Sequence, residues 1–211
     1  MSSPEQAAAA LARLDEITRR LRRDCPWDRE QDERSIVPHT VEEAYELADA
    51  AQAGDDAKLV DELGDVLFQV AFLSLLLEER GAGDFAAVAE GVREKLIRRH
   101  PHVFGEVEAD DAGTVRRNWD EIKRGERGGG LFDDIPETLP STLYAKKVLR
   151  RGEPAGGATK NGGNEEMGLE EAGDLLLAVV ERVVGAGVDP ELALRAAADR
   201  AAERLGERES D

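Results

Sequence analysis

Residues 57–79 read AKLVDELGDVLFQVAFLSLLLEE, and this stretch decides the class of fold. Its apolar residues recur every three or four positions, the spacing that places side chains along one side of an α-helix. The residues that we expect on the buried side are Leu59, Leu63, Val66, Val70, Leu73 and Leu77. The most apolar run, residues 66–77, is too short to span a bilayer. The stretch therefore predicts a helix in the core of a protein that does not cross a membrane.

The sequence on both sides continues the helical pattern. Before residues 57–79 we expect helices over residues 4–22 and about 40–53, and after them over residues 84–99 and 114–124. The buried stripe expected on the helix over residues 84–99 consists of Phe85, Val88, Val92 and Leu96. Three more helices are expected over residues 141–150, 165–184 and 190–204. Strong helix formers dominate and only 4% of residues are aromatic, so an all-α protein is predicted.

The charge balance limits the partners of the chain. There are 46 acidic and 28 basic residues, a formal net charge of -18, which disfavours binding to nucleic acid. A small phosphorylated substrate is compatible with this charge, because divalent cations can turn a carboxylate-rich site into an anion acceptor. Cys25 is the only cysteine, and residues 1–10 lack the basic and apolar regions of a signal peptide. We therefore expect a cytoplasmic protein with neither a membrane nor a nucleic acid as partner.

Acidic residues are placed in pairs on two successive predicted helices. Residues three apart share a helix face, so Glu43 can act with Glu46, and Glu62 with Asp65. If the two helices pack antiparallel, the four carboxylates face one another and raise each other's pKa. A hard divalent cation such as Mg²⁺ removes that repulsion. The spacing therefore indicates a metal site at these four residues, with Glu42 as a further candidate.

Each of these carboxylates also has a simpler interpretation. A single glutamate on a helix usually lies on a solvated face, and Thr40 with Glu43 matches a helix capping box. Gly64 favours the functional interpretation, because glycine inside a helix costs about 1 kcal/mol relative to alanine. We therefore expect a group to pack closely against Gly64.

Basic residues gather near the ends of two predicted helices. Arg98 and Arg99 can interact with the dipole at the end of the helix over residues 84–99, while Lys95 and Lys123 can neutralise phosphate charge. Trp119 suits a stacking platform for a base and a place in the core about equally. His100 and His102 are more typical of a helix stop than of a metal site. The sequence contains no Walker A motif, no dinucleotide-binding fingerprint and no nucleophile elbow.

Four motifs, taken in order, resemble the MazG family of nucleoside triphosphate pyrophosphohydrolases. They lie within residues 11–127: Cys25-Pro26-Trp27-Asp28, the Glu-Glu-x-x-Glu of Glu42, Glu43 and Glu46, the Glu-x-x-Asp of Glu62 and Asp65, and Arg98-Arg99-His100-Pro101-His102-Val103-Phe104. The resemblance implies a four-helix module of the all-alpha NTP pyrophosphatase fold. It also implies a homodimer with the active site close to the subunit interface.

The same resemblance implies a reaction and a set of site residues. The reaction is the Mg²⁺-dependent hydrolysis of NTPs or dNTPs, oxidised ones among them, to nucleoside monophosphate and pyrophosphate, which would cleanse the nucleotide pool. Mn²⁺ is an alternative metal. The implied catalytic metal ligands are Glu43, Glu46, Glu62 and Asp65, with a less defined role for Glu42. The implied nucleotide contacts are Lys95, Arg99, Trp119 and Lys123.

The second half of the chain carries an incomplete repeat of the first. Residues 62–67 are echoed by residues 171–176, and residues 84–88 by residues 189–193, but no second copy of the acidic helix over residues 40–53 exists. We therefore expect a catalytic module over residues 1–127, a linker and glycine-rich loop over residues 128–164, and a degenerate second module over residues 165–211. This second module keeps only Glu171 and Asp174 and is expected to support a dimer without catalysis.

Two alternatives to an enzyme stay open at this point. A regulatory protein on the same helical scaffold would bind nucleotides without converting them. A purely structural bundle would be indifferent to Mg²⁺ and EDTA. Only the pyrophosphohydrolase would convert a nucleotide to products, so a turnover assay distinguishes it from both alternatives.

Overall fold

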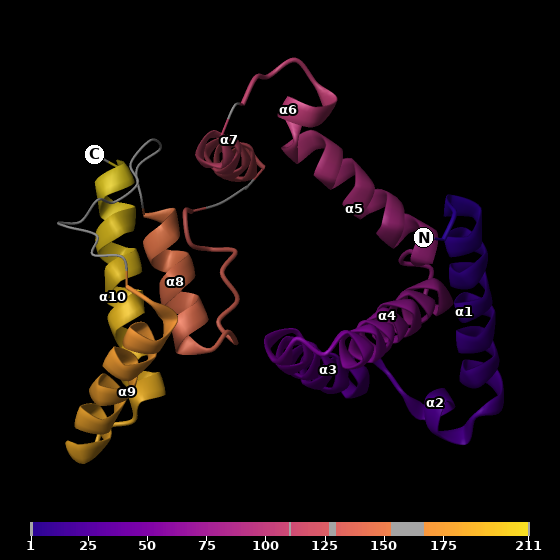
Figure 1. Cartoon of the computed structure of the whole chain (residues 1–211), viewed down its shortest axis with the longest axis horizontal. Coiled ribbons are helices and arrows are strands. Elements are labelled where there is room, and N and C mark those ends of the chain that lie inside the picture. Colours follow the sequence, from indigo (N-terminus) through magenta and orange to yellow (C-terminus); the bar gives the residue numbers. More distant parts are fainter. Residues whose placement is uncertain (1, 110, 127–129, 153–166, 211) are drawn as a thin grey trace. The chain divides into compact units, whose positions relative to one another are not determined.

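The computed structural model describes residues 2–109, 111–126, 130–152 and 167–210 (Figure 1). Every regular element in these ranges is an α-helix, which confirms the all-α prediction. The chain divides into two compact units, Met1–Leu96 and Ile97–Asp211, which are described separately. Within the described ranges, no helix has both the length and the apolar character of a transmembrane span.

The first unit is built around one long central helix. Its elements are α1 (Pro4–Asp24), α2 (Pro26–Glu30), α3 (Glu33–Ala53), α4 (Asp56–Glu79) and, up to Leu96, α5 (Phe85–Arg99). The central helix α4 packs against α3 and also against α1. Ile36 from α3 joins Phe72 and Leu76 from α4 in the core cluster, with Phe68 and Leu73 packed against it. The short helix α2 was not predicted.

The start predicted for α3 is wrong by seven residues. The helix begins at Glu33, where Asp32 and Ser35 cap it reciprocally through two hydrogen bonds of 2.9 Å. Thr40 lies inside the helix, with its hydroxyl donating to the Ile36 carbonyl, so the alternative interpretation of Thr40 and Glu43 as a capping box does not hold. Pro38 is tolerated in the second turn, where its missing N–H removes one backbone hydrogen bond.

The apolar stripes predicted on α4 and α5 are only partly buried. On α4 the core side carries Phe72, which is 1% exposed, whereas Leu63 from the predicted stripe is 50% exposed. No residue of α5 is buried, and Val92 of its predicted stripe is exposed. Because α4 is apolar on most sides, spacing alone does not say which side meets α1 and α3. The side of α4 that packs against α1 and α3 is the one that is buried in this unit.

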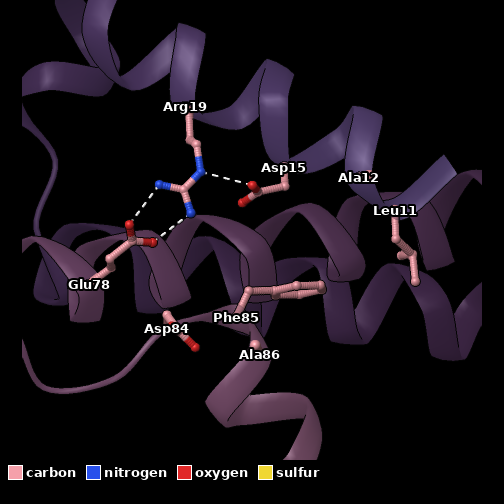
Figure 2. A pocket seen from close by; sticks show the side chains of 8 residues that line it. All are labelled: Leu11, Ala12, Asp15, Arg19, Glu78, Asp84, Phe85 and Ala86. Carbon is pink, nitrogen blue, oxygen red and sulfur yellow. Dashed lines mark hydrogen bonds and ion pairs between the residues drawn. The ribbon is translucent and has the colours of Figure 1, made fainter. Parts of the chain in front are cut away.

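Two arginines of α1 fasten this helix to the C-terminal end of α4. Arg19 donates to Asp15 at 2.8 Å and to both carboxylate oxygens of Glu78 at 2.9 and 2.6 Å (Figure 2). These side chains border a groove of about 350 Å³ that also reaches the start of α5. Its lining is Leu11, Ala12, Asp15, Arg19, Glu78, Asp84, Phe85 and Ala86.

The second arginine, Arg22, connects three segments. Its guanidinium donates to both carboxylate oxygens of Glu79 at 2.8 Å. It also donates to the backbone carbonyls of Asp28 at 2.5 Å and Gln31 at 3.0 Å, and it lies 5.9 Å from the Phe72 ring. The position of the α2 segment, and with it the start of α3, therefore depends on Arg22.

In its described ranges, the second unit contains the end of α5 and five further helices. These are α6 (Pro101–Phe104), α7 (Ala112–Gly125), α8 (Ser141–Arg151), α9 (Leu169–Gly185) and α10 (Pro190–Ser210). The last helix packs mainly along α8, with Ile135, Val148 and Ala198 buried. Glu191 of α10 accepts hydrogen bonds from the Ser141 N–H and hydroxyl at 2.7 and 2.6 Å, which satisfies the first turn of α8.

The remaining predictions on secondary structure have mixed outcomes. The helices expected over residues 114–124, 141–150 and 190–204 correspond to α7, α8 and α10, and that over 165–184 corresponds to α9. The short helix α6 was not predicted. Most of the loop expected over residues 152–164, and the glycines at positions 128 and 129, lie outside the described residues.

Candidate metal centre

A short connection turns the chain back on itself between α3 and α4. Gly54 ends α3 in the left-handed conformation, with φ of 67°, which glycine adopts without steric strain. Asp55 then caps α4 by accepting from the N–H groups of Ala57 and Lys58 at 3.1 and 3.0 Å. Because Glu43 and Asp65 are equally distant from Gly54 along the sequence, antiparallel packing brings them opposite each other.

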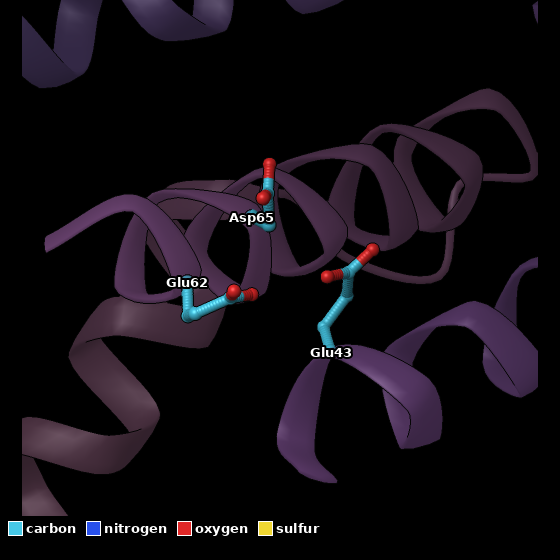
Figure 3. A group of neighbouring side chains, drawn as sticks. All are labelled: Glu43, Glu62 and Asp65. Atoms are coloured by element: carbon cyan, nitrogen blue, oxygen red, sulfur yellow. The ribbon is translucent and has the colours of Figure 1, made fainter. Parts of the chain in front are cut away.

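Three carboxylates meet where α3 and α4 face each other. One ligand oxygen from each of Glu43, Glu62 and Asp65 lies within 4.8 Å of the other two. Glu43 comes from α3, while Glu62 and Asp65 come from successive turns of α4, and Figure 3 shows the Glu62 side chain directed toward that of Glu43. We call these three residues the carboxylate centre. Their exposure is graded, since Glu62 is 5% exposed, Glu43 is half-buried and Asp65 is exposed.

The charge of the carboxylate centre is poorly compensated by the described protein groups. The Oε2 atom of Glu62 is buried and has no hydrogen-bond partner in the described part of the chain. Lys58 Nζ is 3.9 Å from the other oxygen of Glu62. Burial and the neighbouring carboxylate of Glu46 raise the pKa of Glu62, and burial followed by the charge of Asp65 raises the pKa of Glu43.

These observations fit a hard divalent cation. The donor set is entirely carboxylate oxygen, which Mg²⁺ and Mn²⁺ accept. A buried carboxylate oxygen without a partner is unfavourable by itself and becomes favourable when it coordinates a cation. The three residues could therefore hold a metal ion and present it to a phosphorylated ligand.

Two other predicted ligands lie at the margin of the carboxylate centre. Glu46 is exposed on α3, and its charge contributes to the raised pKa values of both Glu43 and Glu62. Glu42 is exposed, and its carboxylate lies 3.7 Å from the Nδ1 atom of His39. The structure thus brings Glu46 toward the centre and pairs Glu42 with a histidine of its own helix.

The close packing expected at Gly64 is not found. A Cβ atom built at this position meets no atom within 4 Å among the described residues, and the same holds for Gly173 on α9. Gly64 lies on an exposed side of α4, between Glu62 and Asp65. The helix is therefore open on this side within the described chain.

The predicted nucleotide contacts are divided between the two units. Lys95 is exposed on α5 in the first unit. In the second unit, the guanidinium of Arg99 lies 5.5 Å from the Trp119 ring centre, and the His100 ring meets the same tryptophan edge-on at 4.8 Å. Lys123 is half-buried on α7, one turn beyond Trp119.

Sequence reasoning missed Glu126, which pairs with both arginines at the end of α5. Its carboxylate accepts from Arg98 at 2.6 Å and from Arg99 at 2.9 and 2.5 Å. Glu126 follows the last residue of α7, and no helical spacing in the sequence pointed to its pairing with Arg98 and Arg99.

The histidines and the second acidic pair belong to the second unit, whereas the carboxylate centre belongs to the first. His100 stands between α5 and α6, as expected of a helix stop, and its ring is 5.5 Å from that of His102. Glu171 and Asp174 are exposed on α9. Among the described residues, none of these four side chains belongs to a group of three or more metal-ligating side chains.

Comparison with known proteins identifies relatives along most of the chain. The sequence model of the MazG nucleotide pyrophosphohydrolase domain matches residues 31–104. A nucleoside triphosphate pyrophosphohydrolase of Escherichia coli K12 is 36% identical over 93% of this chain and 86% of the relative. The nucleoside triphosphate pyrophosphohydrolase/pyrophosphatase MazG of Thermotoga maritima is 34% identical over 95% of this chain and 86% of the relative.

A solved structure is also similar to part of the chain. It is the crystal structure of a MazG-related protein from Thermotoga maritima. The match covers 54% of this chain and 98% of that one, with 27% identity and a TM-score of 0.47.

Proposed function

Because this chain belongs to the MazG nucleotide pyrophosphohydrolase family, we propose that it hydrolyses nucleoside triphosphates to nucleoside monophosphate and pyrophosphate at the carboxylate centre. Water supplies the new oxygen on phosphorus, and the phosphoanhydride bond between the α- and β-phosphates breaks. The observation that carries this assignment is the buried Oε2 of Glu62, which has no hydrogen-bond partner among the described residues and belongs to a side chain that clusters with Glu43 and Asp65.

The metal that we propose is Mg²⁺, with Mn²⁺ as a substitute. Glu43, Glu62 and Asp65 would hold it, and Glu46, whose charge raises the pKa of Glu62, is proposed as a further ligand. A divalent cation bound there supplies Lewis acidity toward a phosphoryl oxygen and activates water. Glu62 is fixed by burial, whereas Asp65 and Glu46 lie at the solvent side, where a substrate can approach.

We further propose that Arg99 and Trp119 contact the nucleotide, together with Lys95 and Lys123. The side chain of Arg99 is only 15% exposed, and Trp119 orients its guanidinium. An arginine whose plane is fixed in this way is suited to bidentate binding of phosphate. The acidic net charge of -18 makes a small metal-bound nucleotide a better ligand than a nucleic acid.

The substrates that we propose are NTPs and dNTPs, damaged ones included, so that the enzyme removes unwanted triphosphates from the cytoplasmic pool. The relatives are named as hydrolases of nucleoside triphosphates, which supports the substrate class. Preference among bases and sugars is settled by assay.

The test is incubation with unmodified and oxidised NTPs and dNTPs, with products identified by chromatography. In Mg²⁺ we expect nucleoside monophosphate and pyrophosphate in equal amounts, and in EDTA neither. Release of single phosphate would contradict the proposed bond cleavage. Nucleotide binding without any product, for every substrate in both Mg²⁺ and Mn²⁺, would instead support a regulatory protein.

We also propose that the chain forms a homodimer through exposed apolar residues of α3 and α4. On α4 these are Val60, Leu63, Leu67 and Val70, whose side chains are between 36% and 71% exposed and follow the three- and four-residue spacing of a helix-packing stripe. On α3, Val37, Val41 and Tyr45 form a second exposed stripe with one residue per turn. Exposed apolar stripes of this kind are typical of protein interfaces.

Sedimentation velocity tests this assembly. We expect a dimer for the wild type and a monomer for Leu63→Lys, because a charge at the centre of an apolar interface is not tolerated. Arg13→Ala on the exposed face of α1 serves as the control and should remain a dimer. A monomeric wild type across the micromolar range would refute the proposal.

A further inference from the structure

The two arginines at the end of α5 are held by a single internal carboxylate. Glu126, which follows α7, accepts from the Nε of Arg98 through Oε1, and from the Nε and Nη2 of Arg99 through Oε2. The distances are 2.6, 2.9 and 2.5 Å, respectively. All three residues belong to the unit Ile97–Asp211, so this contact is defined within one compact part of the chain.

Glu126 occupies the edge of Arg99 that a phosphate would use. The Nε and Nη atoms of a guanidinium present parallel N–H groups, which bind a carboxylate or a phosphate in the same bidentate manner. A phosphate ligand cannot form these hydrogen bonds while the carboxylate of Glu126 keeps them. Binding of a phosphate chain to the Nε–Nη2 edge of Arg99 therefore requires exchange with Glu126.

The surroundings favour such an exchange. The side chain of Glu126 is 22% exposed and that of Arg98 is 55% exposed, so a displaced carboxylate meets water and regains hydration. Hydrogen bonds from Arg99 and Arg98 lower the pKa of Glu126 to about 2, so it is fully ionised at neutral pH. The Trp119 ring lies 5.5 Å from the Arg99 guanidinium, and this contact does not involve Glu126.

We propose that Glu126 is an internal competitor of the substrate phosphates, which holds Arg98 and Arg99 until a phosphate chain replaces it. The inference rests on the proposed function only in taking a phosphorylated nucleotide as the natural ligand. The apparent affinity for phosphate is then the intrinsic affinity multiplied by the fraction of molecules in which Glu126 has left the arginines. Glu126 thus weakens the binding of both substrate and pyrophosphate product, which favours release.

The test is a calorimetric titration of the full chain with pyrophosphate in EDTA, so that no metal recruits the ligand to the carboxylate centre. In Glu126→Gln the dissociation constant should fall about tenfold, because a neutral amide competes poorly for charged donors. The matched control is Glu121→Gln, at an exposed glutamate on α7 five residues before Glu126, which should bind as the wild type does. Adding Arg99→Ala to Glu126→Gln should abolish the gain.

Unchanged or weaker binding in Glu126→Gln would overturn the proposal, because it would show that Glu126 serves to position the arginines. If Glu126→Gln fails to fold, carbon NMR of the wild type gives the answer. On saturation with pyrophosphate, the side-chain carboxyl resonance of Glu126 should shift toward that of the solvated Glu121. A resonance that stays fixed would equally overturn the proposal.

Measuring nucleotide hydrolysis by the wild type separates this inference from the proposed function. If the wild type releases pyrophosphate but Glu126→Gln does not bind pyrophosphate more tightly, the competitor role of Glu126 is refuted and the proposed hydrolysis stands. If Glu126→Gln binds pyrophosphate more tightly but the wild type hydrolyses no nucleotide, the proposed hydrolysis is refuted. The exchange of Glu126 for phosphate at the arginines then stands.

Discussion

Replacing Glu62 by glutamine should abolish hydrolysis and, at the same time, stabilise the metal-free protein. Glu62 is the buried member of the carboxylate centre, and glutamine keeps its shape while removing the charge that we propose binds the cation. We expect kcat/KM to fall by about 1,000-fold, the effect of losing several kcal/mol of transition-state stabilisation. In EDTA the Tm should rise, because the variant no longer buries an unpartnered ionised oxygen.

The effect of Glu62 on the stability of the metal-free protein should depend on pH, with a defined sign. Burial and the carboxylate of Glu46 raise the pKa of Glu62 above its ordinary value of 4.5. A carboxyl group with a raised folded-state pKa destabilises the folded protein once it is ionised. In EDTA the wild type should therefore gain stability as the pH falls from neutral through that raised pKa, while Glu62→Gln should gain less.

Asp61→Asn is the matched control for Glu62→Gln. Asp61 is the preceding acidic residue of α4, it is exposed, and it is not a member of the carboxylate centre. Its replacement should leave kcat/KM within about twofold of wild type and the Tm nearly unchanged. Full activity in Glu62→Gln, or a lower Tm in EDTA, would contradict the role assigned to the carboxylate centre.

Replacing Arg22 by alanine should destabilise the first unit by about 2–3 kcal/mol, as expected for a largely buried guanidinium with several charged and carbonyl partners. The side chain is 19% exposed and loses its pair with Glu79 and its contacts to the carbonyls of Asp28 and Gln31. Urea unfolding followed by circular dichroism measures the change. Arg23→Ala is the control, since Arg23 is 69% exposed and pairs with Asp24 beside it.

Acidification should reduce the difference between Arg22→Ala and the wild type. The hydrogen bonds from Arg22 lower the pKa of Glu79 below its ordinary value of 4.5. The pair therefore stabilises the wild type fully above that ordinary value, and the contribution is lost as the pH falls through the lowered pKa. A difference that stays constant down to strongly acidic pH would show that packing of the Arg22 side chain, and not its charge, holds the three segments together.

The α3–α4 hairpin and its carboxylates could be predicted from sequence because local signals were sufficient. Gly54 with Asp55 marks the turn, and a spacing of three residues fixes the shared face of Glu62 and Asp65. These features depend on helix geometry alone, which does not vary with the rest of the fold. The family resemblance added the reaction, which helix geometry by itself does not provide.

The remaining features depend on tertiary contacts and could not be predicted in this way. Pro38 obscured the true start of α3, because a proline near a helix start is compatible with both outcomes. The buried side of α4 depends on where α1 and α3 pack, so the predicted burial of Leu63 was wrong. Glu126 meets Arg98 and Arg99 from 28 and 27 residues away in sequence, and helix periodicity contains no information about such a pair.

The apolar stripe on α4 has a practical consequence for measurements on this protein. Val60, Leu63, Leu67 and Val70 are solvent-exposed in a single chain, and in the proposed homodimer the two chains that cover them separate on dilution. If that dimer is the active form, specific activity measured at nanomolar enzyme underestimates the value at the concentrations of a cell, and it should increase with enzyme concentration until association is complete. Hydrolysis rates from different preparations are comparable only when the enzyme concentration is the same.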